Sequence, residues 1–260
     1  AAEPISNFLF LVQQGPQTPK MANEALFITL FNWGLHAWAI YGVTALVIAY
    51  FGFRKNTPQL ISGPIRSTFG DHPVAVGTGW IVDLLAIYAI AIGLAGSLAM
   101  GVFQVEDGVA LLFNLDGEGM RLTLTIFAVL CAAYIFPLMV DLSKGMAVLS
   151  NTALIIAVGL LIYLLILGPT SFLMDGIVES IGDYFFRVIP AGFSTFTFFD
   201  ETVKVWFESW SLNYMVWWLA WSPFVGVFIA RISRGRTIRD FIFGVLLAPT
   251  FFSIFWFGVF

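Results

Sequence analysis

Long apolar segments separated by polar loops dominate the pattern of hydrophobic and polar positions along this chain. Each segment has about 20 residues or more, which is the length a helix needs to cross the hydrocarbon core of a membrane. Alternation with a period of two, typical of a membrane barrel, is absent from the sequence. The pattern therefore predicts an all-α, polytopic helical membrane protein, with spans at about residues 24–53, 80–105, 121–140, 147–167, 210–229 and 241–260.

Charged residues are distributed unevenly among the loops between these spans. Eight of the twelve basic residues fall in alternate loops, namely Arg54, Lys55, Arg66, Lys144, Arg231, Arg234, Arg236 and Arg239. The intervening loops are acidic and include Glu106, Asp107, Asp116, Glu118, Asp175, Glu179, Asp183, Asp200, Glu201 and Glu208. Because basic loops favour the cytoplasmic side of a membrane, both ends of the chain are expected outside.

Two further segments are too short or too polar to be complete spans. Residues 1–12 read as the tail of an apolar helix, followed by a polar loop. In residues 171–188, apolar side chains recur every three to five positions with acidic residues between them. That spacing predicts an amphipathic helix at the outer membrane surface, although an ordinary structured loop is the alternative. We expect residues 1–260 to form a single transmembrane domain, from the middle of a longer protein.

Composition supports a membrane protein and excludes several functions. Hydrophobic residues make up 59% of the chain and charged residues 11%, whereas soluble domains carry about 25% charge. No basic, base-stacking surface is evident, so no nucleic-acid partner is expected. The single cysteine, Cys131, excludes an intramolecular disulfide. No nucleophile–base–acid set, metal-ligand spacing or phosphate loop occurs, so we predict neither an enzyme nor a bound cofactor or metal.

Aromatic residues cluster in two of the predicted spans. At about 100° per residue, Trp33, Trp38 and Tyr41 project near 0°, 140° and 80° and share one side of a helix. In a later span, four rings fall within about 60° of one another and a fifth lies about 60° further round; these are Trp217, Trp221, Phe224 and Phe228, with Trp218 as the fifth. Two such helices could form an aromatic cage for a bulky cation. The alternatives are an interfacial belt, which the depth of Trp33 and Trp38 disfavours, and ordinary helix packing.

The stretch Trp33-Gly-Leu-His-Ala-Trp-Ala-Ile-Tyr41 resembles the betaine/choline/carnitine transporter family. Other stretches share the resemblance: Ala2-Glu3-Pro4, Leu149-Ser150-Asn151, Leu167-Gly168-Pro169-Thr170, Gly182-Asp183-Tyr184, Trp217-Trp218, Trp221-Ser-Pro-Phe-Val-Gly226 and Ile229-Ala-Arg-Ile-Ser-Arg-Gly-Arg-Thr-Ile-Arg-Asp240. They follow the order of the family along essentially the whole chain.

The resemblance implies a LeuT-like inverted-repeat transporter fold, of which this chain is a central fragment. The chain would hold the end of the first repeat's broken first helix, the other four helices of that repeat, and two helices of the second. The helix near residues 171–188 would then match the family's amphipathic helix, which lies at the centre of a homotrimer.

The resemblance also implies roles for the aromatic residues. The substrate box would comprise Trp33, Trp38, Tyr41 and Trp218. The transport path would be lined by Trp217, Trp221, Phe224 and Phe228. Sodium is a possible coupling ion, and its ligands are expected mainly outside this chain.

The resulting hypothesis is a secondary transporter of quaternary ammonium compatible solutes such as glycine betaine, choline or carnitine. We expect it to catalyse sodium-coupled uptake by alternating access, as a multi-pass protein of a bacterial inner membrane. The alternatives are a sodium-independent carnitine or betaine exchanger, and a membrane sensor or scaffold that transports nothing.

Overall fold

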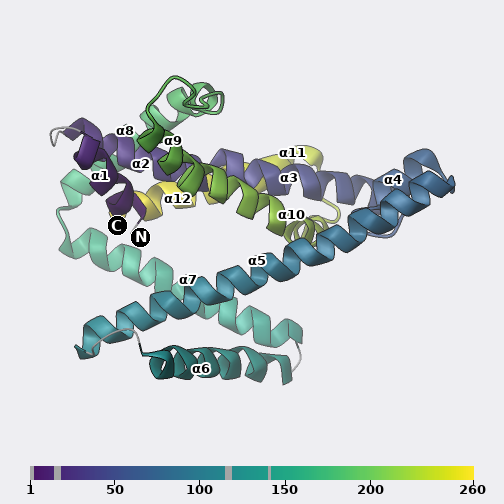
Figure 1. The fold of residues 1–260 in the computed structure, drawn as a ribbon, viewed down its shortest axis with the longest axis horizontal. Coiled ribbons are helices and arrows are strands. Elements are labelled where there is room, and N and C mark those ends of the chain that lie inside the picture. The colour runs from purple at the N-terminus through teal and green to yellow at the C-terminus, as the bar shows by residue number, and fades with distance from the viewer. Residues whose placement is uncertain (1–2, 15–18, 115–118, 140–141) are drawn as a thin grey trace. The chain divides into compact units, whose positions relative to one another are not determined.

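A computed structural model describes residues 3–14, 19–114, 119–139 and 142–260 of the chain. Within these ranges the chain is helical and contains no β-strand, which confirms the prediction of an all-α polytopic membrane protein (Figure 1). Several predicted features lie outside the described residues. They are Ala1 and Ala2 of the expected N-terminal helix, Val140 of the third span, the loop acids Asp116 and Glu118, and the side chain of Lys144.

Five of the described helical stretches are long and apolar enough to cross a membrane. They are Pro19–Arg54, Pro73–Phe113, Ala147–Leu167, Glu201–Ile232 and Ile238–Val259. A shorter apolar helical stretch covers Met120–Ile135. The chain divides into two compact units, one formed by Ala1–Ile90 and Leu164–Phe260 and the other by Ala91–Tyr163.

The first unit begins with two helices and a break. Helix α1 (Glu3–Gln14) packs on α2 (Pro19–Trp33), and α2 ends one residue before α3 (Leu35–Ala49) begins. The π-helical turn η1 (Tyr50–Arg54) continues α3 and leads through a loop to α4 (Gly63–Phe69) and the start of α5 (Pro73–Phe113). The apolar pattern gave no sign of the interruption at Gly34, because a single glycine is tolerated within many helices.

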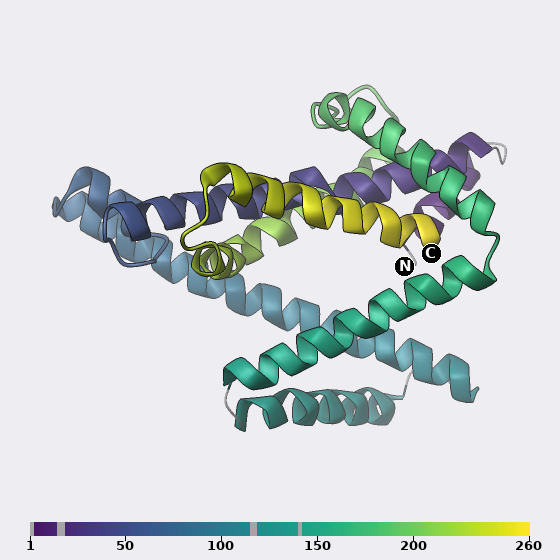
Figure 2. The same ribbon diagram turned by 180° about the vertical axis from the view of Figure 1, so that it is seen from behind.

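The rest of the first unit comes from the end of the chain. Helix α8 (Thr170–Ala191) precedes α9 (Glu201–Phe207), which continues through the π-helical turn η2 (Glu208–Leu212) into α10 (Asn213–Ile232). Helix α11 (Ile238–Ile242), the π-helical turn η3 (Phe243–Leu247) and α12 (Ala248–Val259) complete the unit. Helix α10 lies along α3, and α12 packs against both α2 and α8 (Figures 1 and 2).

The second unit is formed by the later part of α5, by α6 (Met120–Met139) and by most of α7 (Leu142–Leu167). Within it, the Thr123 hydroxyl of α6 donates to the Glu106 carboxylate of α5 at 2.8 Å. This bond gives a buried carboxylate a partner inside an apolar helix pair, where an unpaired polar group is costly.

Candidate functional site

The helix break at Gly34 sets the positions of the first three predicted site residues. Trp33 is the last residue of α2, whereas Trp38 and Tyr41 lie in the first two turns of α3. The expectation that all three share one continuous helix was therefore wrong, since Gly34 has φ −97° and ψ −138°, which is not helical. A Cβ at Gly34 would overlap the Tyr184 hydroxyl and lie 2.6 Å from the Leu30 carbonyl, so only glycine fits there.

The four residues predicted for the substrate box nevertheless meet. The Trp218 ring of α10 lies 5.5 Å from that of Trp33, 6.0 Å from that of Trp38 and 5.0 Å from that of Tyr41, centroid to centroid. Trp33 and Trp218 are almost perpendicular, with an interplanar angle of 87°, and so are Trp38 and Tyr41, at 82°. We call Trp33, Trp38, Tyr41 and Trp218 the aromatic cluster.

Hydrogen bonding fixes the Trp218 indole in this cluster. Its Nε1 donates to the Asn32 carbonyl at 3.1 Å, in the last turn of α2. The break leaves carbonyls in this turn without the helical N–H partners that a continuous helix would supply. Trp218 thus connects α10 to the break itself.

The four residues predicted for a transport path are less closely grouped. Trp221 packs against the buried core formed by Tyr41, Ala45, Ile229 and Phe241. Trp217, Phe224 and Phe228 form no ring pair with any residue of the aromatic cluster. Trp217 lies 6.0 Å from Tyr214, Phe224 lies 6.1 Å from Trp221, and both Phe224 and Phe228 are half exposed.

Helices α3 and α10 also approach closely about two turns from the cluster. A Cβ at Gly226 would lie 2.7 Å from Thr44 Cγ2 and 3.3 Å from the Ala45 amide nitrogen. Ala45 and Ala230 are fully buried there. Small side chains at such positions allow two helix backbones to approach closely.

Sequence reasoning did not assign a role to Glu3, which lies beside the cluster. Its carboxylate accepts hydrogen bonds from Asn32 Nδ2 at 2.9 Å, Trp33 Nε1 at 2.5 Å and the Tyr214 hydroxyl at 2.9 Å. A carboxylate at the start of an apolar segment was the available signal, because such groups in membrane helices have partners or functions. Its partners come from α2 and α10, which the local pattern could not identify.

Helix α8 contacts the break from the side. The Tyr184 hydroxyl accepts a hydrogen bond from the Leu35 amide at 2.6 Å and so caps the first turn of α3. Burial raises the pKa of Tyr184 to about 12, so this hydroxyl stays protonated at neutral pH. Arg187, one turn later, pairs with Glu24 at 2.6 Å and lies 3.9 Å from the centroid of the Phe27 ring. Two anchors therefore hold α8 on α2 and α3.

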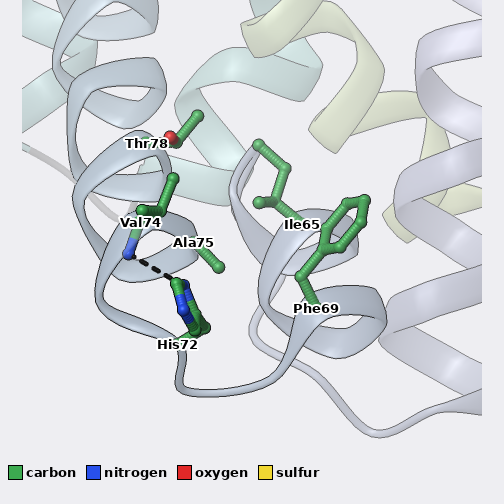
Figure 3. Close-up of a pocket in the computed structure, with 6 residues that line it drawn as sticks. All are labelled: Ile65, Phe69, His72, Val74, Ala75 and Thr78. Atoms are coloured by element: carbon green, nitrogen blue, oxygen red, sulfur yellow. Dashed lines mark hydrogen bonds between the residues drawn. The ribbon is translucent and has the colours of Figure 1, made fainter.

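A separate pocket lies between α4 and the start of α5 (Figure 3). It has a volume of about 380 Å³ and its lining is mostly apolar, comprising Ile65, Phe69, His72, Val74, Ala75 and Thr78. His72 accepts a hydrogen bond from the Val74 amide at 3.3 Å through Nδ1. The pocket shares no residue with the aromatic cluster.

The described part of the chain contains no group of three or more His, Cys, Asp or Glu residues that could hold a metal ion. What the four residues of the aromatic cluster bring together is ring faces. Ring faces attract cations through the ring quadrupole and require no hydrogen bond from the ligand.

The long apolar helices define a multi-pass cell-membrane protein. The sequence profile of BCCT, the betaine/carnitine/choline family transporter, matches residues 1–260, so the chain belongs to this family. This membership confirms the resemblance carried by the stretch from Trp33 to Tyr41 and its companions.

Relatives of the chain are named as transporters, in agreement with the prediction that the protein is not an enzyme. The chain is 40% identical over 261 residues to the glycine betaine transporter OpuD of Bacillus subtilis, covering 100% of this chain and 50% of the relative. It is 36% identical over 260 residues to the high-affinity choline transport protein of Escherichia coli K12, covering 100% of this chain and 38% of the relative. It is 37% identical over 246 residues to glycine betaine transporter 1 of Vibrio parahaemolyticus, covering 94% and 45%. The chain thus spans half or less of the length of these relatives.

Proposed function

We propose that this chain is part of a secondary transporter of quaternary ammonium compatible solutes, such as glycine betaine, choline or carnitine. The observation that supports it is the meeting of four aromatic rings from α2, α3 and α10 around the break at Gly34. The names of the relatives, which are glycine betaine and choline transporters, support the first two of these solutes.

The chemistry of the solute explains why rings suit it. A trimethylammonium group carries a positive charge but has no N–H with which to donate a hydrogen bond. Aromatic faces can replace its hydration, at about 0.5–2 kcal/mol for each ring. In this proposal, Trp33, Trp38, Tyr41 and Trp218 bind the headgroup, and Trp217, Trp221, Phe224 and Phe228 line its path.

The proposed architecture is a partial LeuT-like inverted repeat, forming one transmembrane domain with six spans. Helix α8 would lie along the outer membrane surface in a homotrimer. Its buried side, with Ile177 and Tyr184, packs on other helices of the first unit, while Phe172, Phe186 and Ile189 are 70–84% exposed. An apolar face of this kind suits lipid or further copies of the chain.

The test is uptake of radiolabelled glycine betaine and choline by the full-length protein in proteoliposomes. Trp218→Leu removes the ring that contacts all three other members of the aromatic cluster, so we expect it to abolish saturable uptake while the protein remains folded. Trp256→Leu is the matched control, because among the described aromatic rings Trp256 contacts only Phe252 and Phe260. Wild-type uptake by the Trp218 variant would remove the aromatic cluster from the proposal.

The proposed coupling ion is sodium. Uptake is measured with an inward sodium gradient and with an equal potassium gradient, and we expect accumulation only with sodium. Equal accumulation in both, with exchange against internal solute, would replace symport by exchange. No uptake of either solute under any gradient would favour a sensor or scaffold.

A further inference from the structure

Glu3 is buried at the point where three helices meet. It lies in the first turn of α1, and 8% of its surface is exposed. None of the ion pairs among the described residues includes it; those pairs join Arg187 to Glu24 and Asp183, and Lys204 to Glu201. Three hydrogen bonds from neutral side chains therefore stabilise this carboxylate.

The two carboxylate oxygens have different partners. Oε1 accepts from Asn32, and Oε2 accepts from Trp33 and Tyr214. Asn32 and Trp33 are the last residues of α2, and Tyr214 lies in the first turn of α10. The Glu3 side chain of α1 therefore connects α2, which carries Trp33, to α10, which carries Trp218.

These bonds form part of a closed circuit. The Trp33 ring packs on Trp218 with centroids 5.5 Å apart, and the Trp218 indole donates to the Asn32 carbonyl at 3.1 Å. The circuit closes because the Asn32 side chain donates a hydrogen bond from Nδ2 to the Glu3 carboxylate. Two contacts thus orient the Trp33 indole. Its Nε1 donates to Glu3 at one edge, and its ring packs against the ring of Trp218.

We propose that Glu3 is a positioning residue for substrate recognition, holding the Trp33 indole in the orientation in which its face completes the aromatic cluster. This inference rests on the proposed transport of quaternary ammonium solutes. The Glu3 side chain acts by being long enough to reach Asn32 and Trp33 together and by accepting their hydrogen bonds. In this proposal it makes no contact with the solute.

Two substitutions at Glu3 separate reach from charge. Glu3→Gln keeps the length and can still accept from Trp33 and Tyr214 through its amide oxygen. Its new NH₂ group then faces Asn32, whose buried Oδ1 has no hydrogen-bond partner among the described residues and can accept after a flip of the amide. Glu3→Asp keeps the charge but is one methylene shorter, so it cannot bond Asn32 and Trp33 together from the same backbone position.

Asn7 provides a matched control for packing between α1 and α2. It lies one turn after Glu3, is fully buried, and donates to the Thr29 hydroxyl of α2 at 3.0 Å. It makes no hydrogen bond to the aromatic cluster. If Glu3 acts only by joining α1 to α2, Asn7→Ala should have the same effect on the solute as the Glu3 variants.

The experiment measures KM and Vmax for glycine betaine and choline in the full-length protein for wild type, Glu3→Gln, Glu3→Asp and Asn7→Ala. We expect Glu3→Asp to raise KM about tenfold, as the loss of one charge-assisted bond implies, with Vmax changed much less. Glu3→Gln and Asn7→Ala should stay within about threefold of wild type. A raised KM in Glu3→Gln with a normal KM in Glu3→Asp would overturn the proposal in favour of direct attraction by charge.

A second readout needs no solute. In protein labelled with 5-fluorotryptophan, the Trp33 ¹⁹F resonance is assigned by its absence from Trp33→Phe. We expect this resonance to shift in Glu3→Asp and to stay near its wild-type position in Glu3→Gln and Asn7→Ala. An unshifted resonance in Glu3→Asp would show that Glu3 does not position Trp33. If wild-type protein takes up neither solute, the proposed function fails, whereas the resonance still decides the role of Glu3.

Discussion

The two ends of the contact between α3 and α10 are built from opposite kinds of side chain. At the end near the break, Trp218 meets Trp38 and Tyr41 through large rings whose centroids are 5.0–6.0 Å apart. About two turns along α10, the contact is made by Gly226, against Thr44 and Ala45, with no room for a Cβ.

A bound solute could replace the contacts at the ring end but not those at the small-residue end. Pairs of aromatic rings contribute about 0.5–1.5 kcal/mol beyond their burial, and a cation over a ring contributes a similar amount. A solute can therefore exchange ring–ring contacts for ring–cation contacts at little net cost. The backbone contact at Gly226 has no such substitute, so we infer that it keeps the helices together while the ring end adapts.

Filling the small-residue end should have the largest effect on stability. Gly226→Ala places a Cβ against Thr44 Cγ2, and overpacking of this kind costs about 1–3 kcal/mol. Denaturation of the full-length protein in detergent measures this loss, while the affinity of the folded fraction for glycine betaine should change less than about threefold.

Two further variants test the cause. Thr44→Ser removes Cγ2 but keeps the hydroxyl that donates to the Ile40 carbonyl at 3.0 Å, so it should restore part of the stability lost in Gly226→Ala. Gly182→Ala is the control, because nothing in the described chain lies within 4 Å of its added Cβ and alanine favours a helix. Wild-type stability in Gly226→Ala would contradict the close contact.

Replacing a large ring of the cluster by a smaller one should have the opposite pattern of effects, with a clear loss of affinity and a small loss of stability. Trp38 Nε1 is buried and has no hydrogen-bond partner in the part of the chain that the structure describes, so Trp38→Phe removes aromatic surface and none of the described hydrogen bonds. We expect the apparent affinity for glycine betaine to fall by about threefold to tenfold, with a loss of stability under about 1.5 kcal/mol. Equilibrium binding and denaturation on the same preparation give both numbers, and unchanged affinity would place the solute elsewhere.

The smallest effect should come from Phe228, on the exposed side of α10. This ring is 52% exposed and forms no ring pair with another described residue, so Phe228→Leu should alter stability by less than about 0.5 kcal/mol. If Phe228 lines the path, KM should stay within about twofold while Vmax falls. An affinity loss as large as that of Trp38→Phe would instead assign Phe228 to the binding site.

The sequence could predict the helical class, because length, hydropathy and helical spacing are local properties. The choice of Trp33, Trp38, Tyr41 and Trp218 as one group came from the family resemblance, since helical spacing alone set Trp218 apart from the other rings of its helix. It could not predict the break at Gly34. That break depends on Tyr184, which lies 149 positions from the Leu35 amide that it caps. Glu3 was missed for the same reason, since Tyr214, one of its hydrogen-bond donors, lies 211 positions away.

The Tyr184 cap also bears on how readily the break could straighten. In a continuous helix, the Leu35 amide would donate to the Phe31 carbonyl four residues earlier, whereas here it donates to Tyr184. The amide has one acceptor in either arrangement, so straightening would exchange one hydrogen bond for another with little change in their number. The cost would lie in moving the Tyr184 ring out of the space beside Gly34. Helix α8 therefore sterically opposes straightening of the break between α2 and α3.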